Sequence, residues 1–145
     1  MQKDTEELEN ELAEAKRVED FLADNAENFR SFTLAEYLNK LLAEKNLTKL
    51  DVIQRSQLDA TYVYRIFSGI TKKPARPKII AVAVALGLSP KETNYLLYYA
   101  GVEKLYVRTE WDSIIFFALE NQLSVVDTNE LLQASGELPL LGDVN

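Results

Sequence analysis

One pattern recurs along most of this chain: a serine, threonine or aspartate, then apolar residues at helical spacing, then a residue that ends a helix. Thr33 with Glu36 three residues later forms a capping box, and the next apolar residues follow an i, i+3, i+4, i+7 spacing. No segment alternates apolar and polar residues with the period of two that is typical of a half-buried strand. The pattern predicts an all-α protein of about eight helices with no sheet.

Between residues 33 and 88 these signals predict four successive helices. Thr48 and Asp59 act as caps, while Gly69 and Gly87 end helices. We expect these helices at residues 34–46, 49–56, 60–68 and 78–86. Their shared apolar faces predict a core that includes Leu38, Leu41, Val52, Val63, Ile66 and Phe67.

The composition excludes several classes of function. The 145 residues include no cysteine and no histidine, so disulfides, thiolate metal sites, thiol nucleophiles and imidazole acid–base chemistry are absent. The serines act as caps and the acidic residues are spread over helix surfaces, so we expect no enzyme, no metal site and no cofactor. The longest nearly apolar run, Ile79 to Leu88, is about half the roughly 20 residues that cross a bilayer. We expect a cytoplasmic protein that does not bind membranes.

The net charge of −7 conceals a division along the chain. Residues 1–33 carry four Lys/Arg and ten Asp/Glu, and residues 79–145 carry three and nine, so each segment has a net charge of −6. Residues 34–78 carry nine and four, a net charge of +5. The distribution of charge, a basic segment between two acidic ones, is a better indicator of binding partners than the total charge.

The basic segment contains a helix-turn-helix spacing. The apolar positions between residues 48 and 69 fit two helices joined by a turn of about four residues. On the second helix, Thr61, Arg65 and Ser68 form the stripe opposite the apolar face, with Tyr64 beside it. A helix in the major groove of DNA needs small or hydrogen-bonding side chains near its start and a long donor one turn later, because arginine can bond guanine twice.

Residues 70–78 follow directly and hold two prolines and four basic side chains. A stiff basic segment at the start of a helix suits the binding of phosphates. The basic side chains of this segment are Lys72, Lys73, Arg76 and Lys78.

Residues 34–88 resemble the phage-repressor or XRE-type helix-turn-helix domain, most clearly at residues 62–69, at Lys73-Pro74 and at residues 86–89. Residues after that are similar to the helical C-terminal extension of small predicted regulators of Firmicutes-type bacteria. The resemblance implies a five-helix bundle and a sequence-specific, DNA-binding transcriptional regulator of bacterial or phage type. It also implies that Lys49, Ala60, Thr61, Tyr64 and Arg65 face double-stranded DNA. The family usually has glycine where Gln57 stands, so we expect Gln57 in a left-handed backbone conformation.

Together, the spacing and the resemblance give two sets of candidate DNA contacts. The expected base-reading residues are Ala60, Thr61, Tyr64, Arg65 and Ser68. The expected phosphate contacts are Lys49, Lys72, Lys73, Arg76 and Lys78.

We expect residues 1–32 to form an acidic arm, one long helix whose apolar stripe runs from Leu8 to Phe29. This arm can dimerise, fold back over the basic segment or stay exposed. We expect residues 89–145 to form a helical extension packed on the domain at residues 33–88. This segment contains a repeat: Leu88-Ser89 and the residues that follow recur 35 residues later from Leu123-Ser124. We interpret the repeat as paired helices that cover one another's apolar faces.

Two functional alternatives to simple DNA binding remain open at this point. The chain can be a protein interaction module, an adaptor or inhibitor that uses the repressor-like fold without binding DNA, because its acidic segments would repel DNA if they folded near it. The acidic arm can also cover the basic face until a protein partner removes it. That partner would bind the arm or the C-terminal extension.

Overall fold

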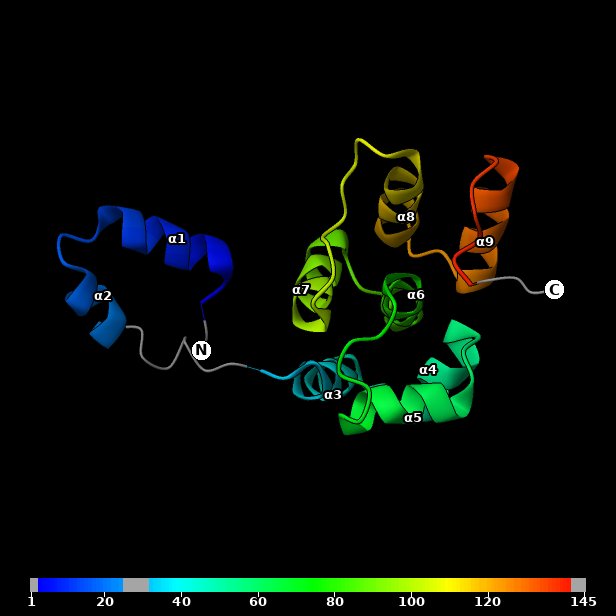
Figure 1. Ribbon diagram of the computed structural model, residues 1–145, viewed down its shortest axis with the longest axis horizontal. Coiled ribbons are helices and arrows are strands. Elements are labelled where there is room, and N and C mark those ends of the chain that lie inside the picture. The colour runs from blue at the N-terminus through cyan, green and yellow to red at the C-terminus, as the bar shows by residue number, and fades with distance from the viewer. Residues whose placement is uncertain (1–2, 25–31, 142–145) are drawn as a thin grey trace. The chain divides into compact units, whose positions relative to one another are not determined.

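The computed structural model describes residues 3–24 and 32–141, and these residues are helical with no β-strand (Figure 1). The all-α class that the sequence predicts is confirmed. The chain divides into two compact units, Met1–Ser31 and Phe32–Asn145. In the described ranges, each helix is too short or too polar to span a bilayer.

In its described residues, 3–24, the first unit contains two short helices, α1 (Thr5–Glu14) and α2 (Val18–Asp24). Asp4 and Glu7 form a capping box at the start of α1, and Ala15 ends it with an extended backbone, ψ 138°. The prediction of one continuous arm helix is therefore wrong. No residue of α1 is buried, although α1 contacts α2, and isolated helices of this length are marginal in water. The last part of the predicted stripe, Ala26 and Phe29, lies outside the described residues.

The second unit contains seven helices in its described part. Their bounds are α3 (Leu34–Lys45), α4 (Lys49–Ser56), α5 (Ala60–Ser68), α6 (Arg76–Leu86), α7 (Pro90–Ala100), α8 (Glu110–Glu120) and α9 (Val125–Ala134). Helices α4 and α5 match the predicted ranges, α3 ends one residue before the predicted Asn46, and α6 begins two residues earlier than expected. The capping boxes Thr33–Glu36 and Thr48–Asp51 are confirmed. Asp59 occupies its predicted cap position, but its side chain makes no capping hydrogen bond.

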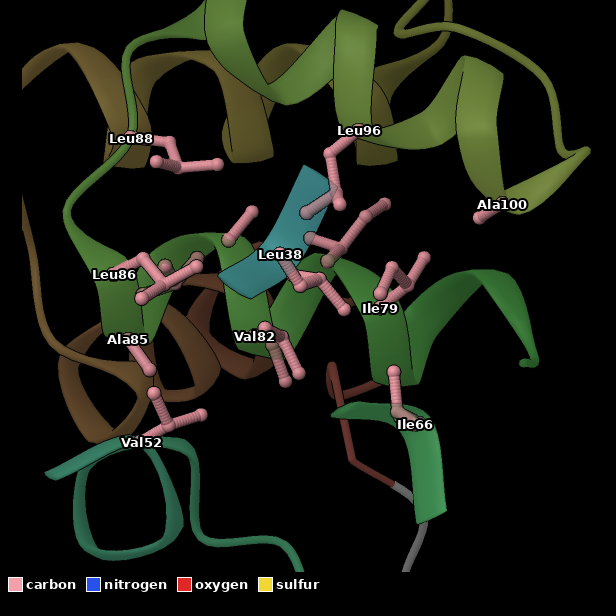
Figure 2. Packing of buried hydrophobic residues seen from close by; sticks show 14 of the residues in the cluster. Leu38, Val52, Ile66, Ile79, Val82, Ala85, Leu86, Leu88, Leu96 and Ala100 are labelled. Atoms are coloured by element: carbon pink, nitrogen blue, oxygen red, sulfur yellow. The ribbon is translucent and has the colours of Figure 1, made fainter. Parts of the chain in front are cut away.

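Helix α6 is the central element of this unit. All residues from Ile79 to Leu86 are buried, so the apolar run noted in the sequence is a helix enclosed on every side. It contacts α3, α4, α7 and α9, and Figure 1 shows it between α3–α5 and α8–α9. Leu38, Val52 and Ile66 approach α6 from other helices, and Leu96 lies on its α7 side (Figure 2). The six core residues predicted from the sequence are all buried.

The repeat predicted in the C-terminal half is also a repeat of tertiary contacts. Asn94 Oδ1 in α7 accepts a hydrogen bond from Leu105 N at 2.8 Å. Asn129 Oδ1 in α9 accepts one from Leu140 N at 2.6 Å, with both partners displaced by 35 residues. Each asparagine therefore holds the segment that follows its helix against that helix.

The repeat extends further back than the sequence pattern indicated, to α6 and α8. Gly87 and Gln122, 35 residues apart, both have left-handed backbones, with φ of 68° and 51°. The next residues make equivalent hydrogen bonds, Leu88 N to Ala83 O and Leu123 N to Ala118 O. Helix pairs α6–α7 and α8–α9 are thus two copies of one helical hairpin, and both contribute to a single core.

Candidate nucleic-acid interface

Helices α4 and α5 and the turn between them place the candidate base-reading stripe. Gln57 has φ 66° and ψ 12°, the left-handed conformation expected at this position. Leu58 N donates a hydrogen bond to the buried Ser56 Oγ at 3.2 Å, which stabilises the turn. Helix α4 packs on α6 and α5 packs on α3, so both helices of the motif are held by the core rather than by each other alone.

Helix α5 has one buried and one exposed face. Val63, Ile66 and Phe67 are buried against the core. The five candidate base-reading residues are all exposed, and helical periodicity places them on one side of α5: Ala60, Thr61, Tyr64, Arg65 and Ser68. Because Thr61 and Arg65 are four residues apart, they lie one above the other on the helix.

The end of α5 is fixed to α3. Gly69 has φ 89°, and a Cβ there would lie 3.7 Å from the Cβ of Ala35. Asn39 Nδ2 donates to Phe67 O at 3.0 Å, and Thr71 N donates to Arg65 O at 3.0 Å. The basic loop that follows therefore leaves α5 in a defined direction.

Three lysines of the candidate phosphate set lie on this loop or at the start of α6, and all three are exposed: Lys72, Lys73 and Lys78. Lys78 Nζ lies 4.4 Å from the ring centroid of Tyr62, a cation–π contact. Burial raises the pKa of the Tyr62 hydroxyl, and a hydrogen bond with the backbone of Ala75 opposes that rise. Tyr62 thus connects α5 to the basic loop and holds Lys78 beside it.

Arg76 has a different environment from these lysines. Its Nη1 and Nη2 donate to the two carboxylate oxygens of Asp112 at 3.0 and 2.8 Å. Its Nε and Nη2 also donate to the carbonyls of Glu103 and Lys104. The guanidinium is therefore committed to α8 and the α7–α8 connection, so we leave Arg76 out of the phosphate-binding set.

The segment that contains α4, α5 and the loop is basic in composition. Residues 49–78 carry seven Lys/Arg and two Asp. Hydrogen bonds with the backbone and hydroxyl of Thr48 hold the pKa of Asp51 below its ordinary value. Over the described residues, no carboxylate forms an ion pair with Arg65, Lys72 or Lys73. All three side chains are exposed.

Sequence reasoning overlooked Arg55, an exposed basic residue in the last turn of α4. Arg55 and Gln57 line a hollow of ≈ 350 Å³ together with residues of α6 and the start of α9. Its charge is visible in the sequence, but its position beside α9 depends on tertiary packing. Lys49, the remaining phosphate candidate, is half-buried at the start of α4.

Comparisons of the chain with protein-family models, curated proteins and solved structures give no match.

Proposed function

We propose that this protein is a sequence-specific DNA-binding transcriptional regulator of bacterial or phage type. One observation carries the proposal: the hydrogen-bonding stripe of α5, with Thr61 and Arg65, is exposed, and the loop that follows α5 carries the exposed Lys72 and Lys73, which form no ion pair with a described carboxylate. In the proposed complex α3–α7 act as a repressor-like five-helix bundle and α5 enters the major groove.

The two sets of residues have different roles in this complex. Thr61 and Arg65 bond base edges, with Ala60, Tyr64 and Ser68 in contact with the same groove. The four lysines 49, 72, 73 and 78 contact phosphates, which fix the position of α5 but carry no sequence information.

The test separates these roles with duplexes that the wild-type chain selects from a random pool. Arg65→Ala should weaken binding to a selected duplex by about 1–3 kcal/mol and relax the preference at one or two base pairs. Lys73→Ala should weaken binding to selected and random duplexes alike and flatten the salt slope by about one unit. Lys104→Ala removes the same charge from the exposed α7–α8 connection and serves as the control.

If DNA affinity is indifferent to both Arg65→Ala and Lys73→Ala, the proposal is wrong. That outcome would leave a protein interaction module as the better interpretation. The exposed Phe117 on α8 supports a protein-binding surface on the C-terminal helices, whether or not the chain binds DNA.

A further inference from the structure

The two copies of the helical hairpin differ in what covers them. In the first copy, Ile79, Val82 and Leu96 are fully buried. Helix α3 contacts both α6 and α7, and Leu38 lies among these side chains (Figure 2). An amphipathic helix therefore covers the apolar face of the first copy.

The equivalent face of the second copy has no such cover within the described residues. Adding 35 to the three buried positions gives Ile114, Phe117 and Leu131. Phe117 is 54% exposed, whereas its equivalent Val82 is fully buried. Together with Ser113, the three residues line a hollow of ≈ 310 Å³. The second copy thus presents the kind of apolar surface that α3 covers in the first.

The charges around this face indicate which helix can cover it. Residues 109–141 carry six Asp/Glu and no Lys or Arg. Of the six, Asp112 is paired with Arg76, which leaves five acidic side chains. The acidic arm of this chain, and the same face of a second copy, would each bring like charges together. A helix with basic residues beside its apolar stripe is complementary both to the apolar hollow and to the acidic side chains of residues 109–141.

We propose that α8 and α9 bind an amphipathic, basic helix of a protein partner, seated on Ile114, Phe117 and Leu131 as α3 is seated on the first copy. The partner's apolar residues at i, i+3, i+4 and i+7 enter the hollow, in the helix-in-groove mode of recognition. Its lysines or arginines lie beside Glu120, Asp127 and Glu130. This surface is separate from the α5 stripe and holds whether or not the chain binds DNA.

The test uses a labelled synthetic helix of leucine and lysine with that apolar spacing, titrated against the full chain by fluorescence anisotropy. A peptide of the same composition in scrambled order, and a leucine–glutamate version, are the peptide controls. We expect the striped lysine peptide to bind and both controls to bind at least tenfold more weakly. Resonance shifts in a ¹⁵N-labelled chain should concentrate on α8 and α9.

Variants of the chain separate the apolar contribution from the charge. Phe117→Ser should weaken peptide binding about tenfold, while Tyr98→Ser, at a 71% exposed position on α7, should leave it within twofold. Glu130→Lys should weaken the lysine peptide and strengthen the glutamate peptide. Far-UV circular dichroism and the fluorescence of the single tryptophan confirm that each variant is folded.

Three outcomes would overturn the proposal. The first is equal binding of the striped and scrambled peptides, and the second is binding that Phe117→Ser does not change. The third is self-association of the chain that Phe117→Ser abolishes in light scattering, because a second copy would then be the occupant of the face.

Discussion

Arg76 Nε and Trp111 Nε1 each donate a 2.9 Å hydrogen bond to a backbone carbonyl, to Glu103 O and Leu138 O respectively. Both the donors and the acceptors are 35 residues apart, so the two side chains occupy equivalent places in the two hairpins. They also meet, because Arg76 Cζ lies 5.9 Å from the Trp111 ring centroid. The copies are therefore joined through the residues that are equivalent in each.

Replacing Arg76 should destabilise the fold. Arg76→Ala removes the bidentate partner of the Asp112 carboxylate, whose side chain is 9% exposed, and leaves that charge with Tyr106 N as a donor. The expected cost is about 3 kcal/mol in the free energy of unfolding, measured by urea denaturation. Asp112→Asn and the double variant complete a double-mutant cycle. If the losses in the free energy of unfolding of the two single variants add up to that of the double variant, the two residues are not coupled.

The two repeat asparagines should contribute similar free energies. Asn94→Ala and Asn129→Ala each remove one acceptor of a partly buried backbone N–H, that of Leu105 or Leu140. Each should lower the free energy of unfolding by roughly 1 kcal/mol. Hydrogen exchange should accelerate at the corresponding leucine amide alone, and a variant that changes neither stability nor exchange would show that its bond is unimportant.

Stability should fall at alkaline pH because of Tyr37. Burial raises the pKa of its hydroxyl above the ordinary value of 10.0, with Glu92 adding to the rise. The folded state therefore favours the protonated tyrosine, so its contribution is complete below pH 10 and is lost as the pH rises above it. Tyr37→Phe should reduce the loss in urea midpoint between about pH 8 and 11. Tyr106→Phe, at a 58% exposed position, is the control, and an equal effect of both would contradict the assignment.

Deletion of residues 1–30 tests the arm. Leu12 and Leu22 are 48% and 47% exposed, and apolar residues on short helices gain stability from a partner surface. We expect the full chain to dimerise through the arm and the deletion to remove the dimer mass in light scattering. A monomer that gains DNA affinity would show instead that the arm covers the basic face, and a deletion that changes neither property contradicts both.

Local signals made most of the helices predictable. Thr33 with Glu36 and Thr48 with Asp51 are side-chain to backbone pairs three residues apart, so sequence alone contains both partners. The exposed stripe of α5 follows from equally local spacing, whereas the left-handed backbone of Gln57 is what the resemblance to the repressor-type domain implies.

The features that sequence did not reveal depend on distant partners. In the sequence Arg76 is one of several basic residues. Its role depends on the ion pair with Asp112, 36 residues away, which the sequence does not reveal. The uncovered Phe117 has the same apolar character as the covered Val82, and only the helices that pack on α6, which include α3 and α4, distinguish them. The break of the arm at Ala15, where the backbone is extended, has no equivalent signal in the apolar stripe of the sequence.

The most direct test of the central claim is the affinity of the full chain for a random duplex as a function of salt, measured by fluorescence anisotropy. Binding through Lys49, Lys72, Lys73 and Lys78 predicts that log K falls linearly with log salt, with a slope of roughly −3 to −4. The Lys72→Ala/Lys73→Ala double variant should reduce that slope by about two. Absence of binding at low salt, or an affinity that does not change with salt, would contradict the assignment of this face to DNA.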